Sequence, residues 1–183
     1  MLAKVGQPAP TFKLASTKGA TSAKNLGTPI ALSDYKGKWL IFFFYPLDFT
    51  FVCPTEILAL SDRLDEIEDL GAEVLGCSTD SVFSHFAWIS TPRDKNGIGG
   101  LKFPLVADYT KDIARSYGVL DEAGGQAQRG LFIIDPDGVL KYATVTDDNV
   151  GRSVDETLRV LQALQTGGLC AADWTPGKEL LAV

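Results

Sequence analysis

The run of aromatic and aliphatic residues from Trp39 to Tyr45 constrains the fold of this chain more than any other feature. Polar residues do not alternate with apolar ones along it, so the pattern predicts a strand that is buried on both faces at the centre of a sheet. Pro46 ends this strand, because proline has no amide hydrogen to donate to a neighbouring strand. The chain is therefore expected to build its sheet around this segment.

Cys53 lies between the buried strand and the start of a helix, whose first turn is marked by Pro54. The first amides of a helix have no partner inside the helix and carry the positive end of its dipole, so a thiolate placed there is stabilised. A buried structural thiol is the alternative, since cysteine is often buried. We favour a reactive thiol, because the strand end, the helix start and the nearby Thr50 meet at one sulfur.

Composition excludes several kinds of protein. A chain of 183 residues suffices for one domain with a sizeable core, and 45% hydrophobic and 22% charged residues are typical of a soluble globular protein. The net charge of −6 argues against nucleic acid as a partner, because phosphate requires a basic surface. No apolar run approaches the length of a membrane span, and the first residues lack an apolar signal region, so we expect a cytoplasmic protein.

Redox chemistry is the most specific function that the three cysteines indicate. Three cysteines do not form a disulfide scaffold in a chain of this length, and their spacing, with a single histidine, does not suit zinc. Cys77 falls within a predicted strand, and we expect it to be a small buried apolar residue. His85 falls within a predicted helix, and we expect it to pack or to form local hydrogen bonds rather than to act as an acid or base.

The remaining segments alternate between helical and strand patterns. An amphipathic helix is expected from Cys53 to about Leu70, with Gly71 as its stop, and a strand at 73–78 follows. A strand, a helix and a strand in this order predict a parallel crossover. The further expected elements are helices at 81–89 and 110–117, strands at 103–108 and 130–135, a hairpin strand at 139–145 after the turn 135–138, and a last helix opened by a capping box at 153–156.

Two motifs around Cys53 resemble a known family. The pattern Pro46-x-x-x-Thr50-x-x-Cys53 is similar to the active-site signature of peroxiredoxins. The longer string from Phe44 to Ile57 resembles the typical 2-Cys subgroup, which includes thioredoxin peroxidases and the bacterial alkyl hydroperoxide reductase peroxidase subunit. The resemblance implies an α/β, thioredoxin-like fold with a central mixed β-sheet flanked by helices. It also implies a peroxiredoxin domain at residues 1–165 and a C-terminal tail at 166–183.

The same resemblance assigns roles to the residues beside the sulfur. It implies that Cys53 attacks the peroxide and that Pro46 shields the pocket from water, which limits side reactions. Thr50 lies three residues before Cys53, one helical turn if the helix begins there, so its hydroxyl can contact both the sulfur and the peroxide. These three residues form the expected nucleophilic part of the site.

The cationic part of the expected site centres on Arg129. A residue at the edge of a strand can be an ordinary surface arginine, but the segment from Arg129 to Asp135 resembles the arginine segment of the family. An arginine supplies the fixed positive charge that peroxide cleavage needs, because its side chain does not deprotonate. Glu56 and Arg152 match a supporting pair of the family that orients this arginine.

Cys170 is the candidate for the second redox-active thiol. It lies in the segment from Gly168 to Trp174, which resembles the resolving-cysteine segment of the family although Ala171 replaces the usual proline. The resemblance implies that Cys170 of a second subunit forms a disulfide with oxidised Cys53, so we expect a homodimer that assembles further into a decameric ring.

The activity implied by this resemblance is that of a thiol-dependent peroxidase. Its substrates would be hydrogen peroxide and organic hydroperoxides, and it would need no cofactor and no metal. A thioredoxin-like protein, or a flavoprotein reductase of the alkyl hydroperoxide reductase type, would recycle it. Neither nucleic acid nor a membrane is expected as a partner.

Two other functions fit the same fold. A ring-shaped assembly with holdase chaperone activity, which the family sometimes shows, would not need Cys170. A general disulfide oxidoreductase is disfavoured, because the sequence from Cys53 to Glu56 lacks the second cysteine of a Cys-x-x-Cys motif. A Cys170 variant that still protected cells after losing peroxidase turnover would favour the chaperone.

Overall fold

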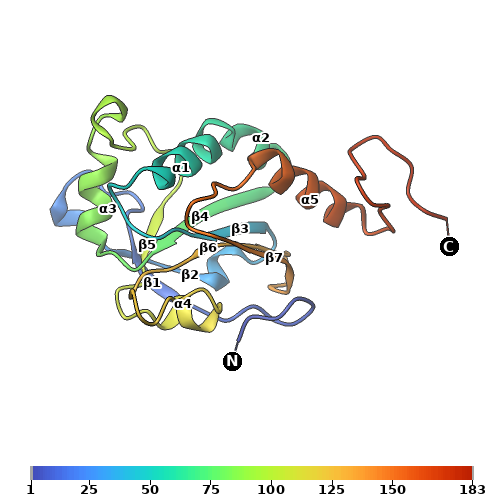
Figure 1. Cartoon of the computed structure of the whole chain (residues 1–183), viewed down its shortest axis with the longest axis horizontal. Coiled ribbons are helices and arrows are strands. Elements are labelled where there is room, and N and C mark those ends of the chain that lie inside the picture. Colours follow the sequence, from blue (N-terminus) through green and yellow to red (C-terminus); the bar gives the residue numbers. More distant parts are fainter. Residues whose placement is uncertain (1, 183) are drawn as a thin grey trace. The chain divides into compact units, whose positions relative to one another are not determined.

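A computed structural model describes residues 2–182, and its largest feature is a seven-stranded mixed sheet in the strand order β2-β1-β5-β4-β3-β6-β7 (Figure 1). The strands are β1 (Lys13–Ser16), β2 (Thr28–Ala31), β3 (Trp39–Phe44), β4 (Ala72–Ser78), β5 (Leu105–Ala107), β6 (Arg129–Ile134) and β7 (Leu140–Thr146). The helices are α1 (Val52–Asp62), α2 (Leu64–Asp69), α3 (Val82–Ile89), α4 (Asp112–Ser116) and α5 (Val154–Thr166), with short 3-10 helices at Ala23–Asn25, Leu32–Tyr35 and Arg93–Lys95.

The chain divides into two compact units. The first ends at Arg152 and contains the whole sheet with α1 to α4. The second begins at Ser153 and contains α5 and the residues that follow it. All residues expected to carry chemistry therefore fall in the first unit, except Cys170.

The strand predicted from the apolar run, β3, lies inside the sheet, next to its middle strand β4. It pairs in parallel with β4, where Phe42 lies opposite Leu75, and antiparallel with β6, where Phe42 lies opposite Phe132. The passage from β3 through α1 and α2 to β4 is the predicted parallel crossover. In Figure 1, α1 and α2 lie on one side of the sheet and α4 on the other. The expected α/β fold, with a central mixed sheet flanked by helices, is confirmed.

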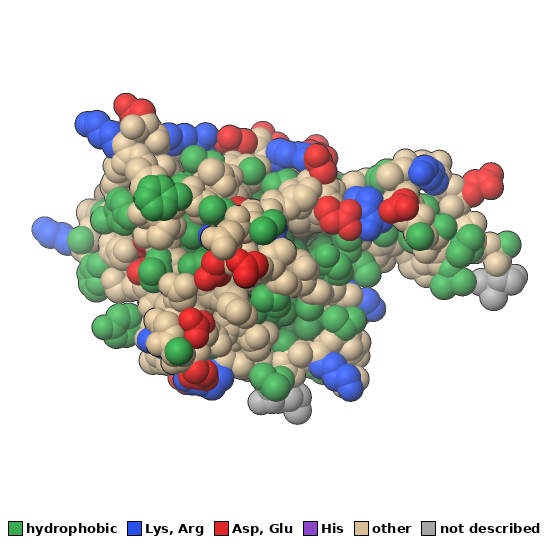
Figure 2. All heavy atoms as spheres, in the orientation of Figure 1, with side chains coloured by type: hydrophobic (Ala, Val, Ile, Leu, Met, Phe, Trp, Pro, Cys, Tyr) green, Lys and Arg blue, Asp and Glu red, His purple; other side chains and the backbone are tan. Residues whose placement is uncertain are grey.

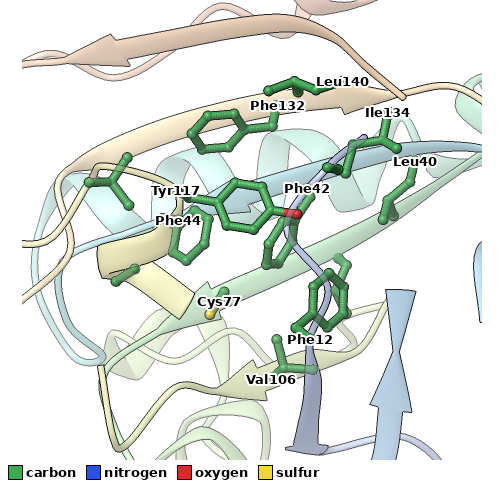
Figure 3. Close-up of a cluster of buried hydrophobic side chains, with 14 of the residues drawn as sticks. Phe12, Leu40, Phe42, Phe44, Cys77, Val106, Tyr117, Phe132, Ile134 and Leu140 are labelled. Atoms are coloured by element: carbon green, nitrogen blue, oxygen red, sulfur yellow. The ribbon is translucent and has the colours of Figure 1, made fainter. Parts of the chain in front are cut away.

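Aromatic side chains from β3 explain why the strand is buried on both faces. Phe42 stacks on Phe12 with 4.8 Å between ring centroids, and the ring of Phe44 lies 5.4 Å from that of Tyr117, the residue after α4 (Figure 3). Successive side chains of a strand point to opposite faces, so Phe43 lies on the other face, where it is also fully buried. The packing of both faces fixes the position of β3 and so of the loop that follows it.

The single helix predicted between Cys53 and Leu70 is in fact two helices. At Arg63 the backbone has φ −108° and ψ 17°, which lie outside α-helical values, so α1 ends before this residue and α2 begins after it. Neither glycine nor proline marks the break, so no residue type signalled it. Leu64, the first residue of α2, is buried.

The other predicted elements of the first unit are present with slightly different ends. The turn between β6 and β7 has the expected chemistry: Gly138 adopts φ +83°, and the carboxylate of Asp135 accepts hydrogen bonds from the amides of Asp137 and Val139. β1 and β2 form an antiparallel hairpin. None of the helices in residues 2–182 has the length and apolar character needed to cross a membrane.

The second unit begins with the predicted helix cap. The side chain of Ser153 accepts a hydrogen bond from the amide of Glu156, and α5 ends at Gly167, which has φ +67°. The residues after α5, as far as Ala182, form no further helix or strand. The guanidinium of Arg159 in α5 donates to the carbonyl of Trp174 at 2.9 Å, which ties this segment to the helix.

Candidate active site

Cys53 occupies the second position of α1, which begins at Val52. The loop that joins β3 to this helix contains Phe49, whose φ of +55° lies in the left-handed region that residues other than glycine rarely adopt. The sulfur of Cys53 is fully buried. The predicted location, between a buried strand and the N-terminus of a helix, is therefore the observed one.

Arg129, the first residue of β6, is the cation nearest to this sulfur. Its Nη1 atom lies 3.4 Å from Sγ of Cys53 and 2.7 Å from a carboxylate oxygen of Glu56. The position follows from the sheet, because β6 is the antiparallel neighbour of β3 and the helix that carries Cys53 follows β3. Only 3% of Arg129 is exposed, so its charge acts in an environment with little water to screen it.

Glu56 is the centre of a buried ion-pair network. It lies three residues after Cys53, about one helical turn along α1. One carboxylate oxygen accepts hydrogen bonds from Nε and the amide of Arg152, at 2.7 and 2.8 Å, and the other accepts one from its Nη2 atom at 3.1 Å. Arg152 also donates to the carbonyl of Gly130 and lies 5.3 Å from the ring centre of Phe43. The carboxylate is thus held between two arginines.

The charges of this cluster support one another. Burial by itself would raise the pKa of Glu56, but the hydrogen bonds and charge of Arg152, with the charge of Arg129, hold this pKa below its ordinary value. Burial by itself would lower the pKa of Arg129, yet its contacts with Cys53 and Glu56 raise this pKa above its ordinary value. Two arginines and one carboxylate leave a net positive charge beside the sulfur of Cys53.

A third contact of Arg129 involves a residue that the sequence did not point to. Nε of Arg129 donates to the backbone carbonyl of Asp148 at 2.9 Å, and Oδ2 of Asp148 accepts from the side-chain amide of Gln126 at 3.1 Å. The Nη2 atom of Arg129 has no recorded protein partner within residues 2–182. It is therefore the donor of this guanidinium that remains available to another molecule.

Thr50 and Pro46 both lie in the loop before α1. Because α1 begins at Val52, Thr50 is outside the helix, and its hydroxyl donates to the carbonyl of Leu47 at 3.0 Å. No hydrogen bond between Thr50 and Cys53 is recorded in the described part of the chain. Pro46 is buried and lies two residues after the end of β3.

The other two cysteines have different surroundings from Cys53. Cys77 is fully buried in β4, where burial foremost raises the pKa of its thiol well above the ordinary value. Cys170 lies in the second unit and is partly exposed, with its sulfur 3.7 Å from the carbonyl of Ala163 and 3.6 Å from the hydroxyl of Thr166. Within residues 2–182 there is no group of three or more His, Cys, Asp or Glu side chains that could hold a metal ion.

The sequence also did not reveal a buried polar network behind the loop that precedes Cys53. Nδ1 of His85 lies 2.8 Å from one carboxylate oxygen of Asp48, and the hydroxyl of Tyr45 donates to the other at 2.8 Å. Nε2 of His85 lies 3.1 Å from the carbonyl of Val106. His85 forms local hydrogen bonds, as expected. Its partner Asp48 could have been suspected from the sequence, because it is an acidic residue shortly after a buried strand.

Known proteins similar to this chain match it along nearly its whole length. The family model described as the AhpC/TSA family matches residues 5–143. A protein of Bacillus subtilis (strain 168) that is named as a peroxiredoxin is 56% identical over 178 residues, which is 97% of either chain. Peroxiredoxin-1 of Gallus gallus is 52% identical over 181 residues, covering 97% of this chain and 89% of the relative.

Solved structures agree with this comparison. The crystal structure of reduced Plasmodium vivax 2-Cys peroxiredoxin superimposes with a TM-score of 0.90 at 41% identity, covering 96% of this chain and 91% of that one. Mycobacterium tuberculosis AhpC superimposes with a TM-score of 0.81 at 40% identity, covering 95% and 99%. The expected thioredoxin-like fold is thereby confirmed, and the chain belongs to the AhpC/TSA family as a peroxiredoxin, a thiol-dependent peroxidase.

Proposed function

We propose that Cys53 is the nucleophile of this peroxidase and that its substrates are hydrogen peroxide and organic hydroperoxides. The observation that carries the proposal is the contact between the buried sulfur and Arg129, at 3.4 Å, inside a network that Glu56 and Arg152 complete. A cation fixed beside a sulfur favours the thiolate, which is the nucleophilic form. No other cysteine in residues 2–182 has a recorded contact with a cationic side chain.

In the first step the thiolate of Cys53 attacks one oxygen of the peroxide. A sulfur–oxygen bond forms while the oxygen–oxygen bond breaks, and the leaving oxygen takes up a proton as water or an alcohol. Negative charge moves from the sulfur to the leaving oxygen, so Arg129 is needed most in the transition state, when Nη2 donates to the oxygens. Thr50 contributes a second donor, and Pro46 keeps water away from the reacting atoms.

The product of this step is a sulfenic acid at Cys53, which condenses with a thiol to a disulfide and releases water. We propose that this thiol is Cys170, carried by the tail at residues 166–183 of a second copy of the chain. Cys53 is fully buried, and two sulfurs must come within about 2 Å to bond. The start of α1 therefore has to open before the disulfide forms.

Recycling requires a dithiol that reduces this disulfide by thiol–disulfide exchange. A thioredoxin-like protein or a flavoprotein disulfide reductase supplies such a dithiol. We propose the cytoplasm as the location, a reducing compartment in which structural disulfides are rare.

The dimer would assemble further into a decameric ring. Several large apolar side chains of the first unit are exposed, among them Phe51 at 89%, and Figure 2 shows such side chains between charged ones on the face in view. Contact with further copies would remove this apolar surface from water.

A Cys170→Ser variant tests the two-subunit cycle. Oxidised wild-type protein should run as a disulfide-linked dimer on a non-reducing gel, with a Cys53–Cys170 peptide in its digest. The variant should lose this dimer and its turnover with thioredoxin, while Cys53 still reacts rapidly with peroxide. A Cys53–Cys170 bond found only within monomers would contradict the two-subunit mechanism and leave the peroxidase assignment intact.

A further inference from the structure

We propose that Gln126, acting through Asp148, is a positioning residue for Arg129 in the reaction with peroxide. The inference rests on the proposed role of Arg129 and concerns how that side chain is held.

Two sides of the guanidinium are engaged by the protein. Nη1 contacts the sulfur of Cys53 and the carboxylate of Glu56, whereas Nε donates to the carbonyl of Asp148. The contacts at Nη1 fix one corner of a planar group, but the group can still pivot about that corner. The bond at Nε prevents this rotation, so it determines the direction in which the remaining donor, Nη2, points.

The carbonyl of Asp148 belongs to a short turn after β7. Within the turn, the amide of Val150 donates to the carbonyl of Asp147 at 3.0 Å, and the amide of Asn149 donates to its carboxylate at 3.1 Å. These contacts shape the turn internally but do not attach it to its surroundings. The turn is held at its ends, where Thr146 pairs with Arg129 and Arg152 bonds Glu56, and the side chain of Asp148 adds an attachment within the turn, through the hydrogen bond from Gln126 at 3.1 Å.

Gln126 is a suitable anchor because its own backbone is fixed. Its carbonyl accepts a hydrogen bond from the amide of Asp121 at 2.9 Å, and the next residue, Ala127, is fully buried and pairs with Leu120. The bond to Asp148 therefore joins a rigid hairpin before β6 to the turn after β7, and Arg129 lies between these two segments in the sequence.

One further feature distinguishes Asp148 from an ordinary surface acid. Its Oδ1 atom is the one buried side-chain oxygen or nitrogen within residues 2–182 that has no hydrogen-bond partner. An unpartnered buried carboxylate oxygen costs free energy, and the hydrogen bond from Gln126 is the one recorded for this side chain within residues 2–182 that offsets that cost. We attribute this placement of the side chain to the need to hold the backbone carbonyl of Asp148 against Nε of Arg129.

Rapid mixing of reduced full-length protein with hydrogen peroxide, followed by mass spectrometry of Cys53, tests the proposal. Gln126→Ala should slow the oxidation of Cys53 by about three- to tenfold, the equivalent of one net hydrogen bond. Asp148→Ala should have the same effect, and the double variant should be no slower than either, whereas Asp148→Asn keeps an acceptor and should restore the rate. Gln128→Ala is the matched control, since Gln128 is an exposed residue of the same type nearby.

The effect must also depend on the arginine. In an Arg129→Ala background, Gln126→Ala should cause no further loss, because the two residues act on the same step. An equal loss in both backgrounds, or a wild-type rate in Gln126→Ala, would overturn the proposal.

A second measurement does not depend on activity. Solvent exchange of the Nε hydrogen of Arg129, followed by nitrogen-15 NMR, should become faster in Gln126→Ala and remain unchanged in Gln128→Ala. Unchanged exchange in both variants would contradict the positioning role. Altered exchange in a protein whose Cys53 does not react with peroxide would instead retain the positioning and reject the proposed function.

Discussion

At the scale of single residues, the site depends on Glu56 more than on any other side chain. This carboxylate accepts hydrogen bonds from both Arg129 and Arg152, and only 4% of it is exposed. Removing one member of a buried ion-pair network leaves the other charges uncompensated, which destabilises a protein more than removal of the whole network does. Glu56 therefore links the stability of the first unit to the arrangement of Arg129, the arginine that we propose as catalytic.

We expect Glu56→Gln to lower the free energy of unfolding by about 3 kcal/mol at neutral pH. The pKa of Glu56 in the folded state is below its ordinary value of 4.5, so its contribution to stability is complete above pH 4.5. It is lost as the pH falls through the lowered folded-state pKa. The difference between wild type and variant, measured by urea denaturation at several pH values, should therefore narrow in acid.

The control for this prediction is Glu66→Gln. Glu66 forms an exposed ion pair with Arg63, and such pairs contribute little to stability. The account of Glu56 is wrong if both variants lose the same stability, or if the loss in Glu56→Gln is unchanged down to the lowest pH at which the protein folds.

Sequence reasoning could identify the charged residues of the site but not every contact between them. Glu56, Arg129 and Arg152 carry distinctive side chains within motifs, so the pattern could indicate them. The partner of Nε in Arg129 is the backbone carbonyl of Asp148. Every residue has a carbonyl, so only the folded path of the chain shows which carbonyl lies within reach of Nε of Arg129.

At the scale of secondary structure, the central question is how a buried Cys53 reaches another sulfur. The sheet fixes the end of β3, and the patterns that predicted β3, β4 and β6 are those of buried strands. The break at Arg63 and the left-handed conformation of Phe49 were not predictable, because they result from packing rather than from residue type. Phe49 lies shortly before α1 and Arg63 directly after it, so both flank the helix that we propose opens.

We expect the first turn of α1 to be locally unfolded in the disulfide form. Hydrogen–deuterium exchange measured by mass spectrometry should be faster for the peptide around Cys53 in oxidised protein than in reduced protein, since opening exposes its amides to solvent. Peptides from β4, in the core of the sheet, should exchange equally in both forms and serve as the control. Equal protection of α1 in the two forms would mean that the disulfide forms without opening the helix.

At the scale of the whole molecule, the exposed apolar side chains connect the fold to assembly. Phe51 and Phe83 are 89% and 66% exposed, and both belong to the first unit. Phe51 immediately precedes α1, so contacts made by this residue would also influence the helix that carries Cys53.

We expect Phe51→Glu and Phe83→Glu to reduce the mass of the assembly from a ring to a dimer, because burying a charge opposes association. Size-exclusion chromatography with light scattering would measure this mass. Leu2→Glu, which changes a residue of similar exposure at the start of the chain, should leave it unchanged. A ring that persists in both phenylalanine variants would show that these side chains lie outside the interface.

The proposed peroxidase cycle depends on the identity of the nucleophile. Trapping of the sulfenic acid tests this identity most directly. Reduced protein is mixed with one equivalent of hydrogen peroxide in the presence of dimedone, and the adduct is located by mass spectrometry. The account predicts a dimedone adduct on Cys53, none on Cys77 or Cys170, and no rapid consumption of peroxide by Cys53→Ser. An adduct on another cysteine, or a Cys53→Ser variant that consumes peroxide at the wild-type rate, would contradict it.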